Sequence, residues 1–322
     1  MATTEGNITT LKHAKSGATC KIHHTGATVI SFVSGDGREN LFLSKQAKLD
    51  GSKAIRGGIP ICFPIFGPPT HPKESTMPQH GFARVNAWQL VSSYDREDSA
   101  GAVFSLELKD AKEGRGENNP WSISQARVDG TDCKLSYEIR LEGHELTTTL
   151  VVKNTGSDSF DFQCLLHNYL KVDGGCAADR SKCSVHGLGG YAITDKVSGD
   201  SGHVQSYDED VELETARGGE VDRVYIHPDD HPTIHAVVDV GCDSSRKVVV
   251  RVEAGGQVDG NVAPVSAVVW NPGPAKARDM SDFGDSEYAD VICVEPGLIG
   301  HQPILSPGAE ARVTQSVIVE NK

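Results

Sequence analysis

Short alternations of apolar and polar residues recur along this chain, and they limit the folds that it can adopt. Residues 134–141 and 145–152 both alternate and flank a turn at Gly143-His144, which predicts a β-hairpin. The same alternation recurs at residues 103–108, 247–252, 265–270 and 312–319. Helical spacing of apolar residues over about ten positions is hard to find. We therefore predict an all-β protein with antiparallel strands in two layers.

No internal repeat or low-complexity linker divides the chain, so we expect one domain spanning residues 1–322 with long loops. Residues 110–120 are charged and predict an exposed loop or a short helix on the rim. Residues 174–190 are rich in glycine and polar residues and predict a loop. Residues 198–220 are acidic and predict a solvated segment.

Charge limits the class of partner. The net charge of -13 and the pI of about 5.4 argue against sequence-independent binding of nucleic acid or of an anionic membrane. An anionic small substrate would need a local cluster of Arg or Lys. No stretch approaches the ~20 apolar residues of a membrane span, and the first residues lack the pattern of a signal peptide. We expect a cytoplasmic monomer that acts on a small molecule, with no nucleic-acid or membrane partner.

The eight cysteines form no Cys-x-x-Cys motif, and several lie in apolar runs. We expect them to be free thiols in a reducing compartment. The alternative is that Cys176 and Cys183, which flank a loop rich in Gly and Lys, pair under oxidation.

Two titratable residues stand in apolar runs that read as buried strands. Glu295 is the one charge in its run, where a carboxylate is costly unless it is paired or used. Pro296 and Gly297 predict that the strand ends just after it, at the rim of a cleft. His167 is the one titratable group of a second apolar run. On two strands of one sheet face, the pair would form a general base and a general acid.

Residues 55–68 predict a stiff, apolar pocket wall. Gly57 and Gly58 allow a close approach of the backbone to another group. The prolines of the segment rule out a helix and a central strand. Arg56 is the one charge that it carries.

A second segment brings an amide, an imidazole and a guanidinium together in Gln79, His80 and Arg84. In an extended chain Gln79 and Arg84 would lie on opposite faces, unless a bulge at Gly81 shifts them. If Arg56 and Arg84 line one cleft, they would bind an anion through charge-assisted bonds. Spacing alone favours the alternative, in which each arginine is structural and pairs with an acid.

Asp222 directly precedes a predicted short strand. Its carboxylate would accept hydrogen bonds from the hydroxyl groups of a ligand. The alternative is that it only forms the turn before the strand, as Asp commonly does.

A metal site at His227, His231 and His235 is not expected. Their spacing of four would place them on one face of a helix. Pro228 and Pro232 lie between them and rule out a regular helix. We read the segment as an exposed loop and expect neither a metal nor another cofactor.

Taken in order, seven motifs resemble the aldose 1-epimerase (mutarotase) superfamily over nearly the whole length, and most closely its glucose-6-phosphate 1-epimerase branch. The motifs are Arg56-Gly57-Gly58-Ile59-Pro60 with Phe63-Pro64, Pro78-Gln79-His80-Gly81-Phe82-Ala83-Arg84, Leu166-His167-Asn168-Tyr169, Val221-Asp222-Arg223-Val224-Tyr225, Val269-Trp270-Asn271-Pro272, Met280-Ser281-Asp282-Phe283 and Val294-Glu295-Pro296-Gly297. No single motif is decisive, but their common order is specific.

The resemblance implies a large antiparallel β-sandwich, a galactose mutarotase-like supersandwich, that interconverts the α and β anomers of a hexose 6-phosphate. Glu295 matches the general base, which takes the proton of the C1 hydroxyl. His167 matches the general acid, which protonates the ring oxygen O5, and it would need a nearby carboxylate to stay charged at neutral pH. The ring then opens, rotates about C1–C2 and closes on the other face. The resemblance implies no cofactor.

The remaining matched residues bind substrate. Arg56, Gln79 and Arg84 match positions that bind the phosphosugar, Asp222 matches a carboxylate that binds hydroxyls, and His80 lies in the same cleft segment. Where the family often has His-Thr-Tyr, this chain has Asn168 between the histidine and the tyrosine. Two alternatives stay open: a mutarotase for unphosphorylated aldoses, and a non-catalytic protein that binds carbohydrate.

Overall fold

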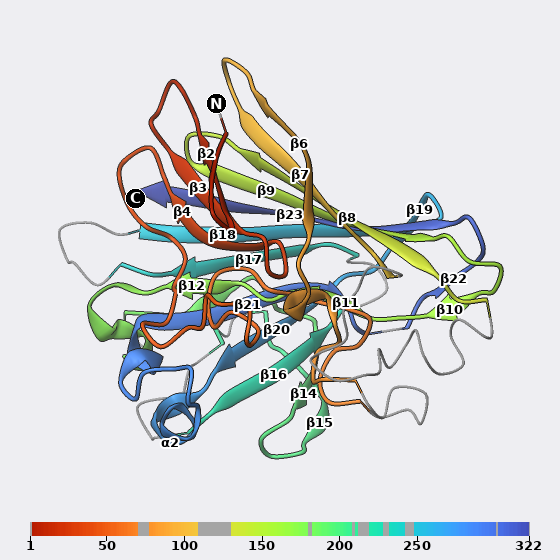
Figure 1. The fold of residues 1–322 in the computed structure, drawn as a ribbon. Coiled ribbons are helices and arrows are strands. Elements are labelled where there is room, and N and C mark those ends of the chain that lie inside the picture. The colour runs from red at the N-terminus through yellow and green to blue at the C-terminus, as the bar shows by residue number, and fades with distance from the viewer. Residues whose placement is uncertain are drawn as a thin grey trace.

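The computed structural model shows two large antiparallel sheets packed face to face (Figure 1). It describes residues 2–69, 77–108, 130–179, 182–207, 210–211, 219–227, 232–241, 248–300 and 302–321. The prediction of an all-β protein with antiparallel strands in two layers is confirmed. The predicted loop or rim helix at residues 110–120 lies outside the described residues.

One sheet has nine strands, and in its long strands alternate side chains are buried. In β8 and β23 buried residues alternate with neighbours that are mostly partly or fully exposed. The predicted hairpin is confirmed, because β8 and β9 pair from Leu141 and Leu146 outward. The strands are β6 (Gln89–Asp95), β7 (Ala100–Glu107), β8 (Cys133–Leu141), β9 (Glu145–Asn154), β13 (Val185–His186), β17 (Ile234–Asp239), β18 (Val248–Val258), β19 (Asn261–Ala263) and β23 (Glu310–Asn321).

The other sheet has eight strands, and its central strands are buried on both faces. One face packs on the nine-stranded sheet, and the other is covered by loops that carry the predicted site. Its strands are β5 (Ile61–Cys62), β11 (Cys164–Leu166), β12 (Tyr169–Lys171), β14 (Ala192–Asp195), β15 (Ser201–Val204), β16 (Val221–Ile226), β20 (Ser266–Asn271) and β21 (Val291–Leu298). In β20 and β21 every residue is buried, so a charge on either strand is removed from bulk water.

Smaller elements cover the edges of the two sheets. They are the four-stranded sheet of β1 (Thr3–Glu5), β2 (Ile8–Lys12), β3 (Thr19–His23) and β4 (Thr28–Val33), the pair β10 (Phe160–Asp161) and β22 (Ile304–Leu305), the helix α2 (Gly273–Asp279), and the 3-10 helices η2 (Ala83–Val85), η4 (Asp173–Ala178) and η6 (Glu287–Asp290). Two of the predicted loops contain regular structure, since most of η4 and all of β13 lie within residues 174–190, and β15 lies in the acidic segment. Within the part of the chain that the structure describes, no helix is long and apolar enough to cross a membrane.

The prediction for the end of the Glu295 strand is wrong. β21 continues through Pro296 and Gly297 to Leu298, so Glu295 lies inside a strand. The proline is accommodated because residues 294–296 face an interruption between β11 and β12, where no ladder hydrogen bond is required on that edge.

The prediction that all cysteines are free is wrong for Cys176, which is disulfide-bonded. The alternative pair is also wrong, because Cys183 is a free thiol. The other free thiols among the described residues are Cys20, Cys62, Cys133, Cys164 and Cys293.

Candidate active site

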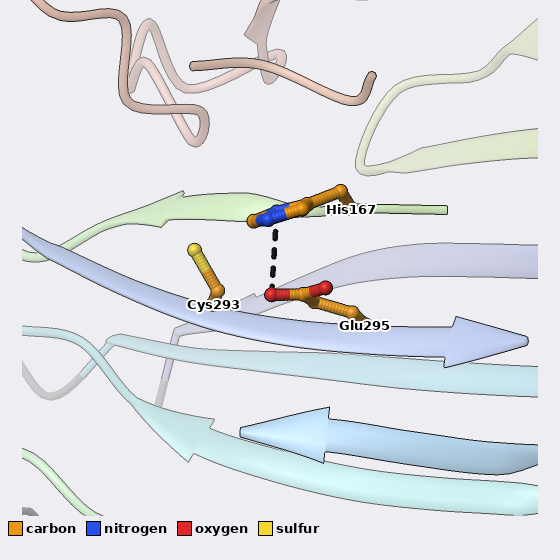
Figure 2. Close-up of side chains that lie close together, drawn as sticks. All are labelled: His167, Cys293 and Glu295. Atoms are coloured by element: carbon orange, nitrogen blue, oxygen red, sulfur yellow. Dashed lines mark ion pairs between the residues drawn. The ribbon is translucent and has the colours of Figure 1, made fainter. Parts of the chain in front are cut away.

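His167 and Glu295 meet at the interruption beside β21. β11 ends at Leu166 and β12 begins at Tyr169, and both strands pair with β21. His167 therefore lies beside the middle of β21, and its Nδ1 is 3.3 Å from Glu295 Oε1 (Figure 2). Only 8% of the His167 side chain and 1% of the Glu295 side chain are exposed. The two groups lie close together as expected, but His167 lies between β11 and β12 and not on a strand.

The residue after His167 holds the interruption in place. The amide of Asn168 donates from Nδ2 to Val294 O on β21 at 2.8 Å and to Gln315 Oε1 on β23 at 2.8 Å. Gln315 Nε2 donates back to Asn168 Oδ1 at 2.9 Å. Because Asn168 and Gln315 are both buried, these bonds fix the backbone on which the imidazole stands.

Aromatic and cationic neighbours orient the imidazole. The His167 ring stacks on Tyr169 with a centroid distance of 4.5 Å and an angle of 8°, and Trp270 meets it edge-on at 5.8 Å. Arg56 Nη1 donates to the Tyr169 hydroxyl at 3.0 Å, and Arg56 Nε lies 3.3 Å from Asp282 Oδ1. Arg56 therefore pairs with an acid, as the alternative of a structural arginine predicted. It also lines the cavity that is described next.

All seven residues predicted for the site line one cavity of about 300 Å³. They are Arg56, Gln79, His80, Arg84, His167, Asp222 and Glu295. A larger cavity of about 960 Å³ shares Arg56, Gln79 and Arg84 with it but includes neither His167 nor Glu295. Acid–base chemistry by this pair therefore belongs to the smaller cavity, and the roles of the seven residues stay predictions.

The segment from Gln79 to Arg84 is a turn and not an extended chain, so the argument from strand parity does not apply. His80 and Gly81 both have positive φ, and η2 follows them. The turn is tight because Gly81 packs on Phe63, where a Cβ would lie 2.1 Å from the Phe63 carbonyl oxygen. Arg84 Nη2 donates to Gln79 O at 2.8 Å, and its buried Nε has no partner among the described residues.

Gly57 and Gly58, in the predicted pocket wall of residues 55–68, allow a close approach of the backbone, as predicted. A Cβ on Gly57 would lie 2.5 Å from Phe42 O, and one on Gly58 would lie 2.0 Å from Val29 O. Both glycines have positive φ, so other residues would also be strained there. The close approach is to the protein's own backbone, and it places Arg56 at the cavity.

His80 is fixed by the same loops. Its Nδ1 accepts a hydrogen bond from Gly67 N at 3.1 Å, and its ring lies 6.0 Å from His167 and 5.4 Å from Phe66. Burial, Arg84 and His167 hold the pKa of His80 well below its usual value. His80 is therefore a neutral polar group of the cavity.

Several lining residues were not predicted from the sequence. Lys196 follows β14, and its Nζ lies 3.8 Å from the centroid of the Phe66 ring. Lys276 pairs with Glu220, which also accepts a hydrogen bond from Trp270 Nε1 at 3.0 Å. Lys196 carries no local signal, because it reaches the cavity only through the pairing of β14 with β16.

Burial disfavours the charged forms of both members of the central pair. It raises the pKa of Glu295 well above its usual value, and Asp222 raises it further. Burial also lowers the pKa of His167 well below its usual value, and Arg84 and Arg56 lower it further. The carboxylate that a charged His167 would need does lie beside it, but burial and the two arginines still lower the pKa of the imidazole. Burial therefore favours the neutral carboxylic acid and the neutral imidazole, and in these forms the pair holds one transferable proton.

Cys293 lies two residues before Glu295 on the same side of β21 (Figure 2). Its thiol, His167 and Glu295 offer ligand atoms within 4.8 Å of one another. A metal would require a thiolate, but burial and Glu295 raise the pKa of this thiol well above its usual value. We therefore assign no metal to this group. Of the three histidines considered above, His231 lies outside the described residues.

Comparison with known proteins places the chain in a family. The aldose 1-epimerase family matches residues 7–317. A protein of Cenchrus ciliaris is 32% identical over 305 residues, covering 91% of this chain and 78% of that protein. A protein of Escherichia coli K12 is 29% identical over 297 residues, covering 92% and 85%. Both carry the provisional name glucose-6-phosphate 1-epimerase.

Solved structures agree on the fold. A Salmonella typhimurium protein, provisionally described as a mutarotase, superposes with a TM-score of 0.72 over 98% of this chain and 90% of its own, at 23% identity. The Slr1438 protein of Synechocystis sp. PCC 6803 superposes with a TM-score of 0.71 at 19% identity, covering 100% of both chains. The chain belongs to the aldose 1-epimerase family, and it is an isomerase with the galactose mutarotase-like β-sandwich fold.

Proposed function

We propose that this protein interconverts the α and β anomers of hexose 6-phosphates, with glucose 6-phosphate as the preferred substrate. The observation that carries the proposal is the buried pair of His167 and Glu295, 3.3 Å apart, in a cavity that Arg56 and Arg84 also line. The names of the relatives support a phosphorylated sugar. The acidic net charge argues against nucleic acid or an anionic membrane as the partner. Action as a monomer in the cytoplasm is part of the proposal.

Anomer exchange needs one acid and one base at the same time, and the pair holds one proton. Moving that proton from Glu295 to His167 gives a carboxylate and an imidazolium without changing the total charge. The carboxylate then takes the proton of the C1 hydroxyl, and the imidazolium gives a proton to O5 as the C1–O5 bond breaks. After rotation about C1–C2, the reverse transfers close the ring and restore the pair.

The phosphate would favour that transfer. Arg84 and Arg56 both hold down the pKa of His167. A phosphate that binds them compensates their charge, so the imidazolium becomes easier to form in the complex. The anionic group then both anchors the sugar and prepares the acid.

A mutarotase for unphosphorylated aldoses is the second candidate. The ion pair of Arg56 with Asp282 favours it, because that guanidinium is already partly compensated. A non-catalytic sugar-binding protein is less consistent with the site, since binding alone does not require a buried acid beside a buried imidazole.

A coupled assay that follows the α-to-β conversion of glucose 6-phosphate above its spontaneous rate tests the proposal, with glucose as the control substrate. We expect acceleration of both, with a higher kcat/KM for the phosphorylated sugar. A higher kcat/KM for glucose would favour the second candidate, and no acceleration of either sugar would refute both.

A further inference from the structure

The structure assigns Lys196 as the residue that completes the phosphate site of Arg56 and Arg84 and that selects for phosphorylated sugars. This inference rests on the proposed function and names a determinant of its specificity. Neither the sequence motifs nor the relatives' names single out this residue.

A phosphate dianion is held best by cations that no carboxylate already compensates, and the cavity has two of them. Four cationic side chains line it, but Arg56 pairs with Asp282, and Lys276 pairs with Glu220. Among the described carboxylates, none lies within ion-pair distance of the other two, Arg84 and Lys196.

The position of Lys196 is built into the sheet. β14 pairs with β16 up to Asp195 and Arg223, and the next amide, Lys196 N, donates to Asp222 O at 2.8 Å. This bond ties the backbone of Lys196 to the strand that carries Asp222. The side chain then passes over Phe66, and its ammonium lies 3.8 Å from the ring centroid.

The position also suits the structure of the substrate. The reacting C1 end of the sugar must reach His167 and Glu295, which are buried. C6 is bonded to C5, which the ring oxygen O5 joins to C1, so the 6-phosphate extends from the ring-oxygen side of the sugar and needs a cation that lines the same cavity. Lys196 is exposed, lines the same cavity and stands over Phe66, whose ring contacts His80.

A plain structural role for Lys196 makes a different prediction. If the lysine only covers Phe66, its removal should not distinguish a phosphorylated ligand from an unphosphorylated one. If it binds phosphate, its removal should weaken the phosphorylated ligand alone. The comparison needs ligands that do not react, so that binding is measured without chemistry.

Isothermal titration calorimetry with 1,5-anhydroglucitol 6-phosphate and 1,5-anhydroglucitol provides this comparison, since both lack the anomeric hydroxyl. We expect Lys196→Ala to raise the Kd of the phosphorylated ligand by about 10- to 100-fold, the effect of losing one charge-assisted hydrogen bond, and to leave the other unchanged. Lys196→Arg should keep most of the affinity. Lys153→Ala is the matched control, because Lys153 is exposed on β9 outside the cavity and its loss changes the net charge equally.

Three results would overturn the inference. An unchanged Kd in Lys196→Ala, or an equal loss for both ligands, would show that Lys196 does not bind the phosphate, while the proposed function would stand. An equal loss in Lys153→Ala would reduce the effect to net charge. If the unaltered protein does not prefer the phosphorylated ligand, the proposed phosphosugar specificity falls with it.

Discussion

Replacing Glu295 by Gln should lower the activity and raise the thermal stability, because both depend on the burial of this carboxyl group. The two side chains have nearly the same shape, so the packing of β21 is kept. The change removes only the ability to ionise beside His167, 3.3 Å away. It leaves a neutral amide in a place where Glu295 Oε2 has no hydrogen-bond partner among the described residues.

The expected loss of activity follows from the loss of one positioned base. Such a group contributes about 10²- to 10⁴-fold to a rate. At about 1.36 kcal/mol per factor of ten, this corresponds to a barrier increase of about 2.7–5.4 kcal/mol. The loss should fall on kcat, because the cations that hold the phosphate are unchanged.

The expected change in stability has the opposite sign. The pKa of Glu295 is raised in the folded state, so its contribution to stability is complete below the ordinary value near 4.5 and is lost as the pH rises through the folded pKa. A glutamine has no such loss. Glu295→Gln should therefore have a higher Tm than the unaltered protein at pH 7–8, and the difference should shrink towards pH 4.5.

Two measurements on the same samples check this: the coupled anomerisation assay, and thermal unfolding by circular dichroism across that pH range. A variant with near-normal turnover would refute the base assignment. A variant with a lower Tm at every pH would refute the account of a carboxyl group that burial keeps protonated.

Three further predictions concern the rest of the site. His167→Ala should lower turnover by about 10²- to 10⁴-fold. In the unaltered protein without ligand, ¹⁵N NMR should show a His167 ring that is still neutral at pH 6.5, because burial and the two arginines lower its pKa. An imidazolium at that pH would contradict this direction of the shift. Replacing Arg56 or Arg84 by Ala should raise the KM for glucose 6-phosphate and hardly affect glucose, and equal losses in the steady-state kinetics of both sugars would count against phosphate binding there. Asn168→Ala should lower the free energy of unfolding by about 1–3 kcal/mol in urea titrations, since it removes the donor to the buried Gln315 Oε1. An unchanged value would show that the network is dispensable.

Much of the fold was predictable because a strand that is buried on one face alternates apolar and polar residues in its sequence. In β8 and β9 every second side chain is buried, and that alternation is written in the sequence. Glu295 was recognisable for a related reason, since a single carboxylate in an apolar run is unusual unless it is used.

Other features depend on neighbours that a local pattern does not contain. Pro296 suggested a strand end, but the interruption between β11 and β12 lets β21 continue. The turn that orients Arg84 depends on the packing of Gly81 against Phe63. Lys196 became a candidate only once the register of β14 with β16 placed it at the cavity.

The direction of the pKa shift of His167 was also beyond local reasoning. A histidine near a carboxylate is normally expected to be charged more easily. Here burial and two guanidinium groups act in the opposite direction on His167. Both guanidinium groups come from distant segments of the chain, so only the folded structure reveals their effect.

The most direct test of the central claim is the rate of exchange between the anomers of glucose 6-phosphate, measured by NMR exchange spectroscopy with catalytic amounts of protein. The account predicts exchange well above the spontaneous rate, lost in both the Glu295→Gln and the His167→Ala variants. Exchange at the spontaneous rate with the unaltered protein, or acceleration that survives in either variant, would contradict it.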